Sequence, residues 1–380
     1  MVMRCTTVHT IDDIPRRDWN VLAGSANPFT RHEFLAALEG NGCLGERWGW
    51  LPHHITVHEN DRLVGACPVY LKTNSYGEFV FDMAWADAYQ RYGHRYFPKF
   101  VSAVPYTPVT GPRIMVAPEA SRAAVVEAIT RKALELVEEY DGSGMHWLFT
   151  DAAATDELEA AGFMRRVGVQ YHWANRGYRD FEDFLSTLTS RRRKDIRRER
   201  RLARDSGAEF EVLNGHDATD EHWAVYHACY TATFDRKWGY ATLSEAFFRE
   251  LAATMPDNVV LVMVRHRGEY VAGAFNLAGD DGLFGRHWGT LKPLDYVHFE
   301  ACYYQAIDYA IARGLSRFEA GAQGEHKIQR GFLPRATYSA HYIRESAFRT
   351  PIADFLQRER REMAAVIAQL EGGSPYRQTD

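Results

Sequence analysis

The chain has 380 residues, of which 46% are hydrophobic and 25% charged, a composition typical of a globular protein long enough for two domains. No stretch approaches the roughly 18 apolar residues of a membrane span, and the first residues lack the apolar run of a signal peptide, so we expect a cytoplasmic protein. The five cysteines are scattered without the spacing of a metal site, and we expect reduced thiols.

The first half of the sequence predicts alternating helices and strands. In chain order these are a helix near 31–39, strands at 54–58, 63–71 and 79–85, a helix at 120–140, a strand at 145–149, a short helix at 156–161 and a strand at 167–173. Between residues 85 and 118 the chain is rich in proline and aromatic residues. So long an irregular segment indicates either a binding loop or lid, or a packed surface loop.

A basic segment separates the two halves. Between Arg191 and Arg204 there are nine Lys or Arg and two Asp or Glu, a local charge of +7, which leaves −12 for the rest of a chain whose net charge is −5. The segment has no Gly or Pro, so we expect a helix that begins near 187–190 and ends at Gly207. Such a helix is either a solvated connection between domains or a surface that attracts phosphate on a coenzyme, a transfer RNA or an anionic lipid head group.

The second half repeats the pattern of the first. The expected elements are helices at 217–234 and 244–255, strands at 259–265, 271–277 and 283–289, a helix from 299 to 310, strands at 316–320 and 337–343, and a final helix at 351–370. The dipeptide Gly-Phe occurs at 162–163 and at 331–332, and each copy is followed at the same spacing by a strand histidine, His172 or His341. These echoes predict a duplicated fold.

Polar, ionisable and aromatic residues are densest between residues 285 and 330, more than a core alone requires. The strand at the start of this stretch carries Arg286, His287 and Trp288 in a row. We therefore expect the candidate active site in this part of the chain.

The helix that follows the strand has one apolar face at the spacing i, i+3, i+4, i+7, i+8 and i+11, which predicts burial of Phe299, Cys302, Tyr303, Ala306, Ile307 and Ala310. A second face carries Glu300 and Tyr304 one turn apart. Gly314 is expected to end the helix. A carboxylate and a phenol therefore lie near the helix start.

The loop at 321–327, with the sequence GAQGEHK, places an acid, a base and a cation in three successive positions, Glu325, His326 and Lys327. Its two glycines permit positive φ and a close approach of the backbone to a substrate. Three consecutive ionisable groups after two glycines are poorly explained by packing, which favours a catalytic or binding loop.

Each half of the chain resembles a GNAT acyltransferase unit, and the paired arrangement resembles the FemAB-like branch of predicted N-acyltransferases, often labelled peptidoglycan biosynthesis or recognition proteins. The motifs behind this resemblance are Asn27-Pro28-Phe29, GRHWG at 285–289, HFEACYY at 298–304, GAQGEHK at 321–327 and RGF at 330–332. The resemblance implies an α/β fold with mixed sheets, in which two tandem GNAT-like domains are separated by the basic helical arm. The expected parts are a first domain at 1–176, a linker with the basic helix at 177–207, a second domain at 208–345, and a docking helix with a tail at 346–380.

What the resemblance implies for function is the formation of an amide by acyl transfer to an amine. One reading is an enzyme that takes an acyl-CoA-type thioester, long chains included, and acts on a small, lipid or cell-envelope amine. A second is a Fem-type transferase that uses aminoacyl-tRNA and contacts the RNA through the basic segment. The third is a recognition module without catalysis.

One loop departs from the wider superfamily. Acetyl-CoA enzymes of this fold hold the pyrophosphate with a glycine-rich loop at a helix N-terminus. The corresponding loop here, at 290–297, contains no glycine. Acetyl-CoA binding in the usual mode is therefore not expected, and the donor stays open. The basic segment can instead hold the protein to the anionic inner face of a membrane.

Acyl transfer to an amine requires a base for the proton of the amine and a donor that stabilises the oxyanion. We favour Glu325 and His326 for the acid–base role, with His287 and Glu300 as further candidates. No HxxxH or HExxH pattern supports a zinc site, and no metal is expected. The residues expected to bind substrate or donor are Arg286, Trp288, Tyr303, Tyr304, Gln323, Lys327 and Arg330. By its place on the apolar face, Tyr303 is also typical of a core residue.

Overall fold

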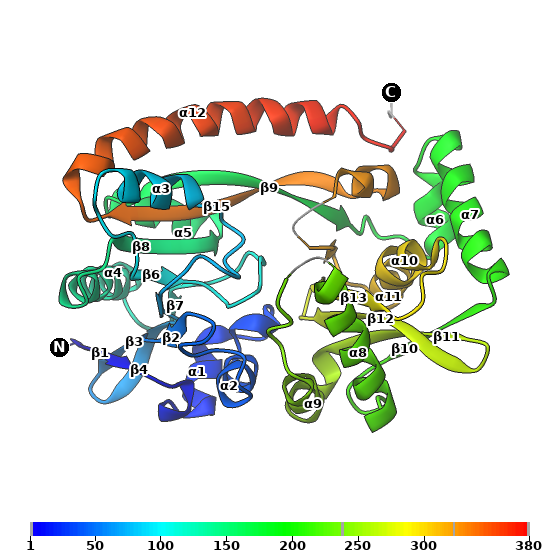
Figure 1. The fold of residues 1–380 in the computed structure, drawn as a ribbon, viewed down its shortest axis with the longest axis horizontal. Coiled ribbons are helices and arrows are strands. Elements are labelled where there is room, and N and C mark those ends of the chain that lie inside the picture. Colours follow the sequence, from blue (N-terminus) through cyan, green and yellow to red (C-terminus); the bar gives the residue numbers. More distant parts are fainter. Residues whose placement is uncertain (1–2, 237–238, 322–323, 378–380) are drawn as a thin grey trace. The chain divides into compact units, whose positions relative to one another are not determined.

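A computed structural model describes residues 3–236, 239–321 and 324–377, and the chain forms two compact units (Figure 1). Unit 1 consists of Met1–Val169 and Ala336–Val366, and unit 2 consists of Gln170–Arg335 and Ile367–Asp380.

Two strands pass from one unit into the other. Strand β9 (Met164–Ala174) begins in unit 1 and ends in unit 2, and strand β15 (Leu333–Ile343) begins in unit 2 and ends in unit 1. Each half of the sequence therefore supplies the end of its last strand to the unit that the other half builds. Helix α12 (Ser346–Glu371) crosses the boundary in the same way near its end.

The strands of unit 1 form two groups. In the first the order is β1-β3-β4-β7, with antiparallel neighbours. In the second the order is β2-β5-β6-β8 and then the end of β15; β6 and β8 run parallel and the other neighbours antiparallel. The strands are β1 (Met3–Val8), β2 (Trp50–Pro52), β3 (His54–Glu59), β4 (Arg62–Cys67), β5 (Tyr70–Lys72), β6 (Lys99–Ser102), β7 (Met115–Val116) and β8 (Gly144–Thr150).

The core of unit 1 forms where helix α4 packs on the sheet. Val125, Ile129, Ala133 and Val137 recur at every fourth position of α4 and are buried in one cluster with Trp147 of β8. The helical elements of this unit, besides the start of α12, are η1 (Ile11–Asp13), α1 (Arg16–Ala23), η2 (Pro28–Thr30), α2 (His32–Gly40), α3 (Met83–Arg91), α4 (Arg122–Glu139) and α5 (Ala152–Ala160).

The strands of unit 2 follow the order β10-β11-β12-β13-β14 and then the end of β9. Strands β13 and β14 run parallel, and the other neighbours are antiparallel. The strands are β10 (Ala208–Leu213), β11 (Val259–His266), β12 (Glu269–Ala278), β13 (Gly282–Thr290) and β14 (Arg317–Glu319).

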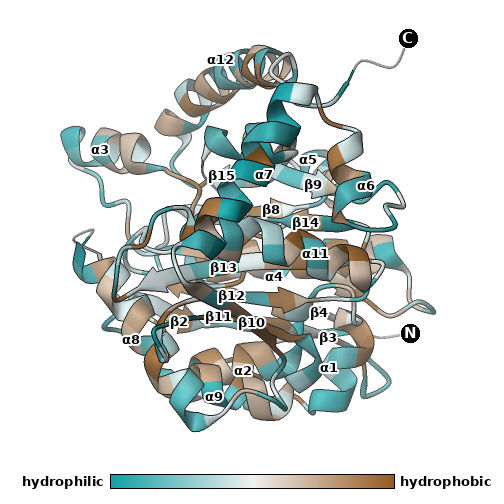
Figure 2. Ribbon diagram, turned by 90° about the vertical axis from the view of Figure 1, so that its right-hand side faces the viewer, coloured by the Kyte–Doolittle hydropathy of each residue, from teal (hydrophilic) through white to brown (hydrophobic). Residues whose placement is uncertain are grey.

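Helix α7 confirms the helix expected in the basic segment, and most of its length is hydrophilic (Figure 2). Its buried residues are Ile196 and Ala203, seven positions apart on one face. The helical elements of unit 2 are α6 (Phe181–Ser186), α7 (Ser190–Asp205), α8 (Asp220–Arg236), α9 (Glu245–Thr254), η3 (Pro256–Asn258), α10 (Val297–Phe299), the π-helical segment η4 (Glu300–Tyr304), α11 (Gln305–Ala312) and the 3-10 helix η5 (Glu325–Arg330).

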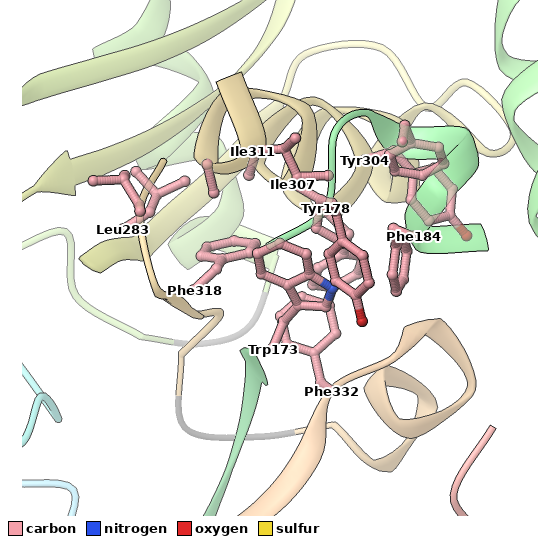
Figure 3. Close-up of a cluster of buried hydrophobic side chains, with 14 of the residues drawn as sticks. Trp173, Tyr178, Phe184, Leu283, Tyr304, Ile307, Ile311, Phe318 and Phe332 are labelled. Carbon is pink, nitrogen blue, oxygen red and sulfur yellow. The ribbon is translucent and has the colours of Figure 1, made fainter. Parts of the chain in front are cut away.

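The core of unit 2 is an aromatic and aliphatic cluster in which Trp173 of β9, Phe184 of α6, Phe318 of β14 and Phe332 are buried together (Figure 3). The apolar helix face expected at 299–310 is confirmed, since it contributes to this cluster. Its members there are Tyr303, Ala306, Ile307 and Ala310, with Phe299 and Cys302 packed against them. The helix is less regular than expected, because η4 makes one π-helical turn in its middle.

One expected strand is wrong. The chain at 79–85 is not a strand, and helix α3 begins there at Met83. Trp85 and Tyr89, four residues apart, are buried on one side of α3, whereas Phe81 and Met83 are exposed. The apolar run therefore combines one helix face with a solvent-exposed segment, and a run of this length does not distinguish the two from a strand.

The segment at 85–118 is less irregular than expected, because it contains most of helix α3 and the short strands β6 and β7. Tyr89 of α3 is buried, as are Tyr96 and Tyr106 in the loops, whereas Tyr92 is exposed. Among the residues that the structure describes, no helix is long and apolar enough to cross a bilayer.

The contact between helix α8 and strand β13 depends on a glycine, which supplies the first prediction. A Cβ atom added to Gly289 would lie 2.0 Å from the backbone oxygen of Cys229 in α8. We expect Gly289→Ala to lower the free energy of unfolding by about 2 kcal/mol or more, because either the helix or the strand must move. Gly40→Ala is the control, since an added Cβ there meets no atom within 4 Å. Urea denaturation of both variants tests this, and equal stability of the two would contradict it.

Candidate functional site

The candidate site forms where strands β13 and β14 separate. Among the described residues, their ladder pairs Gly282–Phe284 with Arg317–Glu319, whereas β13 continues to Thr290. On its other side β13 carries a β-bulge: Phe275 of β12 lies opposite His287 and Asn276 lies opposite Gly285, so no β12 residue faces Arg286. Beyond Phe284, β13 therefore leaves the regular ladder on both sides, and side chains of α8 bond its carbonyls: Thr233 donates to Trp288 and Arg236 to Thr290.

A cavity of about 100 Å³ lies at this separation. Four residues predicted from the sequence line it, namely Arg286, His287 and Trp288 from β13 and Tyr303 from η4. The remaining lining comes from β12, from the turn of helix that carries His298 and Cys302, and from Ala320 after β14. The structure therefore brings the GRHWG strand and the HFEACYY helix together around one space.

The two basic residues of β13 carry different charges. Burial lowers the pKa of Arg286 to about 10, so its guanidinium stays protonated at neutral pH. Burial, assisted by the neighbouring charge of Arg286, holds the pKa of His287 well below its ordinary value. Arg286 and His287 thus contribute a cation and a neutral imidazole to the cavity wall, which also contains His298.

Tyr303 connects the cavity to the GAQGEHK loop. Its hydroxyl lies 3.0 Å from Nε2 of His326. Burial raises the pKa of the Tyr303 phenol, which stays protonated. Burial, followed by the charges of Arg330 and Lys327, lowers the pKa of His326 below its ordinary 6.5, so the imidazole is neutral at pH 7. A protonated phenol in the cavity wall is thereby hydrogen-bonded to a neutral base, the exposed His326, which does not itself line the cavity.

Glu199 of α7 fixes the two segments that carry this pair. One of its carboxylate oxygens accepts a hydrogen bond from the hydroxyl of Tyr304 in η4, and the other accepts one from Nη2 of Arg330 in η5 at 2.7 Å. The Arg330 guanidinium also lies over the ring of Phe299 at 3.6 Å. Tyr304 and Arg330, both expected to bind substrate, contact α7 and are not among the residues that line the described cavity.

The next residue, Arg200, forms a second bridge from α7 to the same helix. Its Nη2 lies 2.9 Å from Oε1 of Glu300 and 2.7 Å from Oδ2 of Asp308. Gln305 donates a further hydrogen bond of 2.7 Å to Glu300. The buried Glu300 carboxylate is therefore fully engaged, and the role that the geometry supports for it is to position η4.

The remaining predicted residues lie in or beside η5. Glu325 is exposed at its start. Lys327 is buried, and its Nζ donates a hydrogen bond of 2.9 Å to the carbonyl of Gly321. Burial lowers its pKa to about 8. Gln323 falls outside the described residues.

Sequence reasoning missed Glu319, the last residue of β14. Its side chain is buried, with Oε1 3.1 Å from Nε of Arg317 and Oε2 3.7 Å from Nε2 of His172. Oε2 has no hydrogen-bond partner within the described part of the chain. Burial raises the pKa of Glu319 to about 7 and lowers that of His172 to about 3. Strand β14 has only three residues, too few for its alternation to mark this acid as buried.

Comparison with known proteins supports the fold. The model of a FemAB-like family, described as peptidoglycan biosynthesis/recognition, matches residues 10–378. No curated protein matches the sequence. Similar solved structures include FemX, with a TM-score of 0.55 and 11% identity over 93% of this chain and 100% of that one. The C-terminal domain (DUF2156) of a putative lysylphosphatidylglycerol synthetase from Agrobacterium fabrum matches with a TM-score of 0.55 and 8% identity over 93% and 97%.

L-PGS from Bacillus licheniformis is also similar, with a TM-score of 0.52 and 11% identity over 89% of this chain and 98% of that one. At sequence identities of 8% to 11%, these similarities show a shared fold and nothing more. The fold class expected from the sequence, α/β with two tandem GNAT-like domains, is confirmed.

The buried Lys327 generates a prediction of pH dependence. Its pKa in the folded protein, about 8, lies below the ordinary 10.5, so protonation costs stability. That cost is present in full below about pH 8 and disappears as the pH rises to the ordinary value. The difference in the free energy of unfolding between Lys327→Met and wild type should therefore change by about 1–3 kcal/mol in favour of the variant when the pH is lowered from above 10.5 to neutral. Chemical denaturation across this range measures the difference, and a difference that does not change with pH would refute the burial argument.

Proposed function

The chain belongs to the FemAB-like family of peptidoglycan biosynthesis or recognition, and on this basis we propose that it is a transferase of cell-envelope biosynthesis that joins an acyl group to an amine. The bond formed is an amide, and the donor is an activated carbonyl, which we take to be an acyl-CoA-type thioester. The name of the lysylphosphatidylglycerol synthetase with a similar fold is in keeping with a lipid or envelope acceptor.

The observation that carries the proposal is the hydrogen-bonded pair of Tyr303, which lines the cavity, and His326, which is exposed behind it. When the amine attacks the carbonyl, its nitrogen becomes positively charged and must lose a proton. The Tyr303 phenol can receive that proton while it passes its own to the neutral Nε2 of His326. Because no free phenolate forms, the raised pKa of Tyr303 does not oppose the transfer.

Arg286 supplies the second requirement. The tetrahedral intermediate carries a negative oxygen, which a buried cation stabilises. Arg286 is a protonated cation that lines the cavity. When the intermediate collapses, the C–S bond breaks and the proton held by His326 passes to the departing thiolate. The products are the amide and the free thiol, and the enzyme is restored.

A second candidate donor is an aminoacyl-tRNA, which one specific observation favours. Arg191, Lys194, Arg198 and Arg201 follow one another at spacings of three and four along α7 and are exposed. Within the described residues none of them forms an ion pair with a carboxylate. Such a row suits the phosphates of a nucleic acid, and a steep fall of tRNA binding with salt would support it.

The catalytic prediction concerns His326. His326→Asn should lower kcat/KM for amide formation by about 10²- to 10⁴-fold, because the proton acceptor is lost, and Tyr303→Phe by about tenfold or more. The assay measures thioester consumption with acyl-CoA donors of graded chain length and a panel of amines. His216→Asn is the matched control, since this exposed histidine of unit 2 pairs with Asp257 on the surface.

Three outcomes would change the account. If kcat/KM falls strongly in Glu325→Gln but not in His326→Asn, the base is Glu325. Turnover with charged tRNA but with no thioester in the panel would replace the donor. Binding of both substrates without turnover under any condition would indicate a recognition module.

A further inference from the structure

The cavity beside β13 has a closed end and an open end. Ala274, Phe275 and Asn276 of β12 line it and are 3%, 2% and 1% exposed. Trp288 and His298 also line it, but they are half-buried, and their ring centroids lie 5.4 Å apart. A substrate group therefore enters past the half-buried rings and stops at β12.

The closed end has a fixed depth. The side-chain amide of Asn276 donates a hydrogen bond of 3.1 Å to the carbonyl of Val260, which holds this side chain in place. A Cβ atom added to Gly285 would lie 3.2 Å from the ring of Phe318 and 3.3 Å from Oδ1 of Asn276, so the space around this glycine is filled. Because protein interiors are close-packed, the cavity cannot deepen without moving the core behind it.

The volume of the cavity limits what it can hold. The cavity measures about 100 Å³. An apolar cavity of about 150 Å³ in another protein holds benzene, which has six carbons, so this one has room for roughly four. A long hydrocarbon chain does not fit inside it.

The charge of the wall is a second limit. Arg286 is protonated, and no aspartate or glutamate is among the described residues that line the cavity. The buried Glu319 bonds Arg317 and is not one of the lining residues. An ammonium group inside the cavity would therefore meet a cation and no lining carboxylate, which is unfavourable in a buried site.

Three groups meet at the reacting carbonyl in the proposed reaction, namely the acyl chain, the sulfur of coenzyme A and the amine. Coenzyme A is many times larger than the cavity and must extend through the open end. The amine arrives as an ammonium ion at neutral pH, and Arg286 repels it from the closed end. The acyl chain is the remaining group, and it fits when it is short and uncharged.

We propose that this cavity selects the donor, because it accepts acyl groups of up to about four carbons and excludes both longer chains and aminoacyl groups. This inference rests on the proposed acyl transfer and specifies its donor, a short-chain acyl thioester. Ala320 and Trp288 line the cavity outside β12 and are the residues that set the length of the acyl group.

The experiment compares kcat/KM of the full chain for straight-chain acyl-CoA donors from two to sixteen carbons, with one amine acceptor held constant. The value should fall at least tenfold from butyryl-CoA to octanoyl-CoA, because the added methylenes have no room. β-Alanyl-CoA is the matched probe of charge, since it carries an ammonium group where butyryl-CoA has its terminal methyl group. It should react at least tenfold more slowly than butyryl-CoA.

Two variants test the residues that set the length. Ala320→Val should fill part of the cavity and lower kcat/KM for butyryl-CoA at least tenfold more than for acetyl-CoA. Trp288→Ala should open the cavity and raise the ratio of octanoyl to butyryl turnover at least tenfold. Ala312→Val, a change of the exposed last residue of α11, should keep the wild-type profile. Each comparison is a ratio within one variant, so a partly unfolded sample does not imitate the result.

The outcomes separate this inference from the function on which it rests. Faster turnover of octanoyl-CoA or a longer donor than of butyryl-CoA by wild type would overturn the inference and leave acyl transfer standing. Equal turnover of β-alanyl-CoA and butyryl-CoA would refute the exclusion of aminoacyl groups. Wild-type ratios in both Ala320→Val and Trp288→Ala would refute the assignment of the selecting residues. Failure of every thioester with every amine would refute the proposed donor itself.

Discussion

The candidate site depends on two adjacent side chains of α7, Glu199 and Arg200. Glu199 bonds both Tyr304 and Arg330, and Arg200 bonds Glu300, so the helical turn of η4 and the 3-10 turn of η5 are held to one helix. A buried ion pair adds little net stability. Separating its partners would leave an uncompensated buried charge, so the pair holds its two segments in a fixed arrangement. The pairing of Tyr303 with His326 follows from this fixed spacing.

Helix α7 therefore has two roles on two faces. Its inner face uses one acid and one arginine to position the site, while Arg191, Lys194, Arg198 and Arg201 on its outer face are exposed and form no ion pair with a carboxylate among the described residues. Unit 1 uses the same physical device, because Glu78, Asp82 and Lys99 are buried ionic groups whose effect is to fix a loop with an apolar outer side. In both units the buried charges set the geometry of the segments that carry them.

Periodicity and motif content predicted much of this. The apolar face of the helix at 299–310, the basic helix and the duplicated α/β plan all depend on local spacing, which the sequence displays directly. The contacts of Glu199 and Glu300 depend on tertiary structure, since an acid in a basic run is indistinguishable from a solvated residue. The exchange of the ends of β9 and β15 depends on pairing between distant segments, for which a single sequence carries no signal. Glu319 escaped notice because a strand of three residues gives too short an alternation to reveal a buried acid beside the site.

The most direct test of the account is the protonation state of His326, measured by nitrogen NMR of the imidazole. The His326 signals are identified as those missing from the spectrum of the His326→Asn variant. The account predicts a neutral imidazole at neutral pH, with a pKa below 6.5 that shifts when Tyr303 is replaced by Phe. A His326 that is protonated at neutral pH, or one whose titration ignores the loss of the Tyr303 hydroxyl, would contradict it.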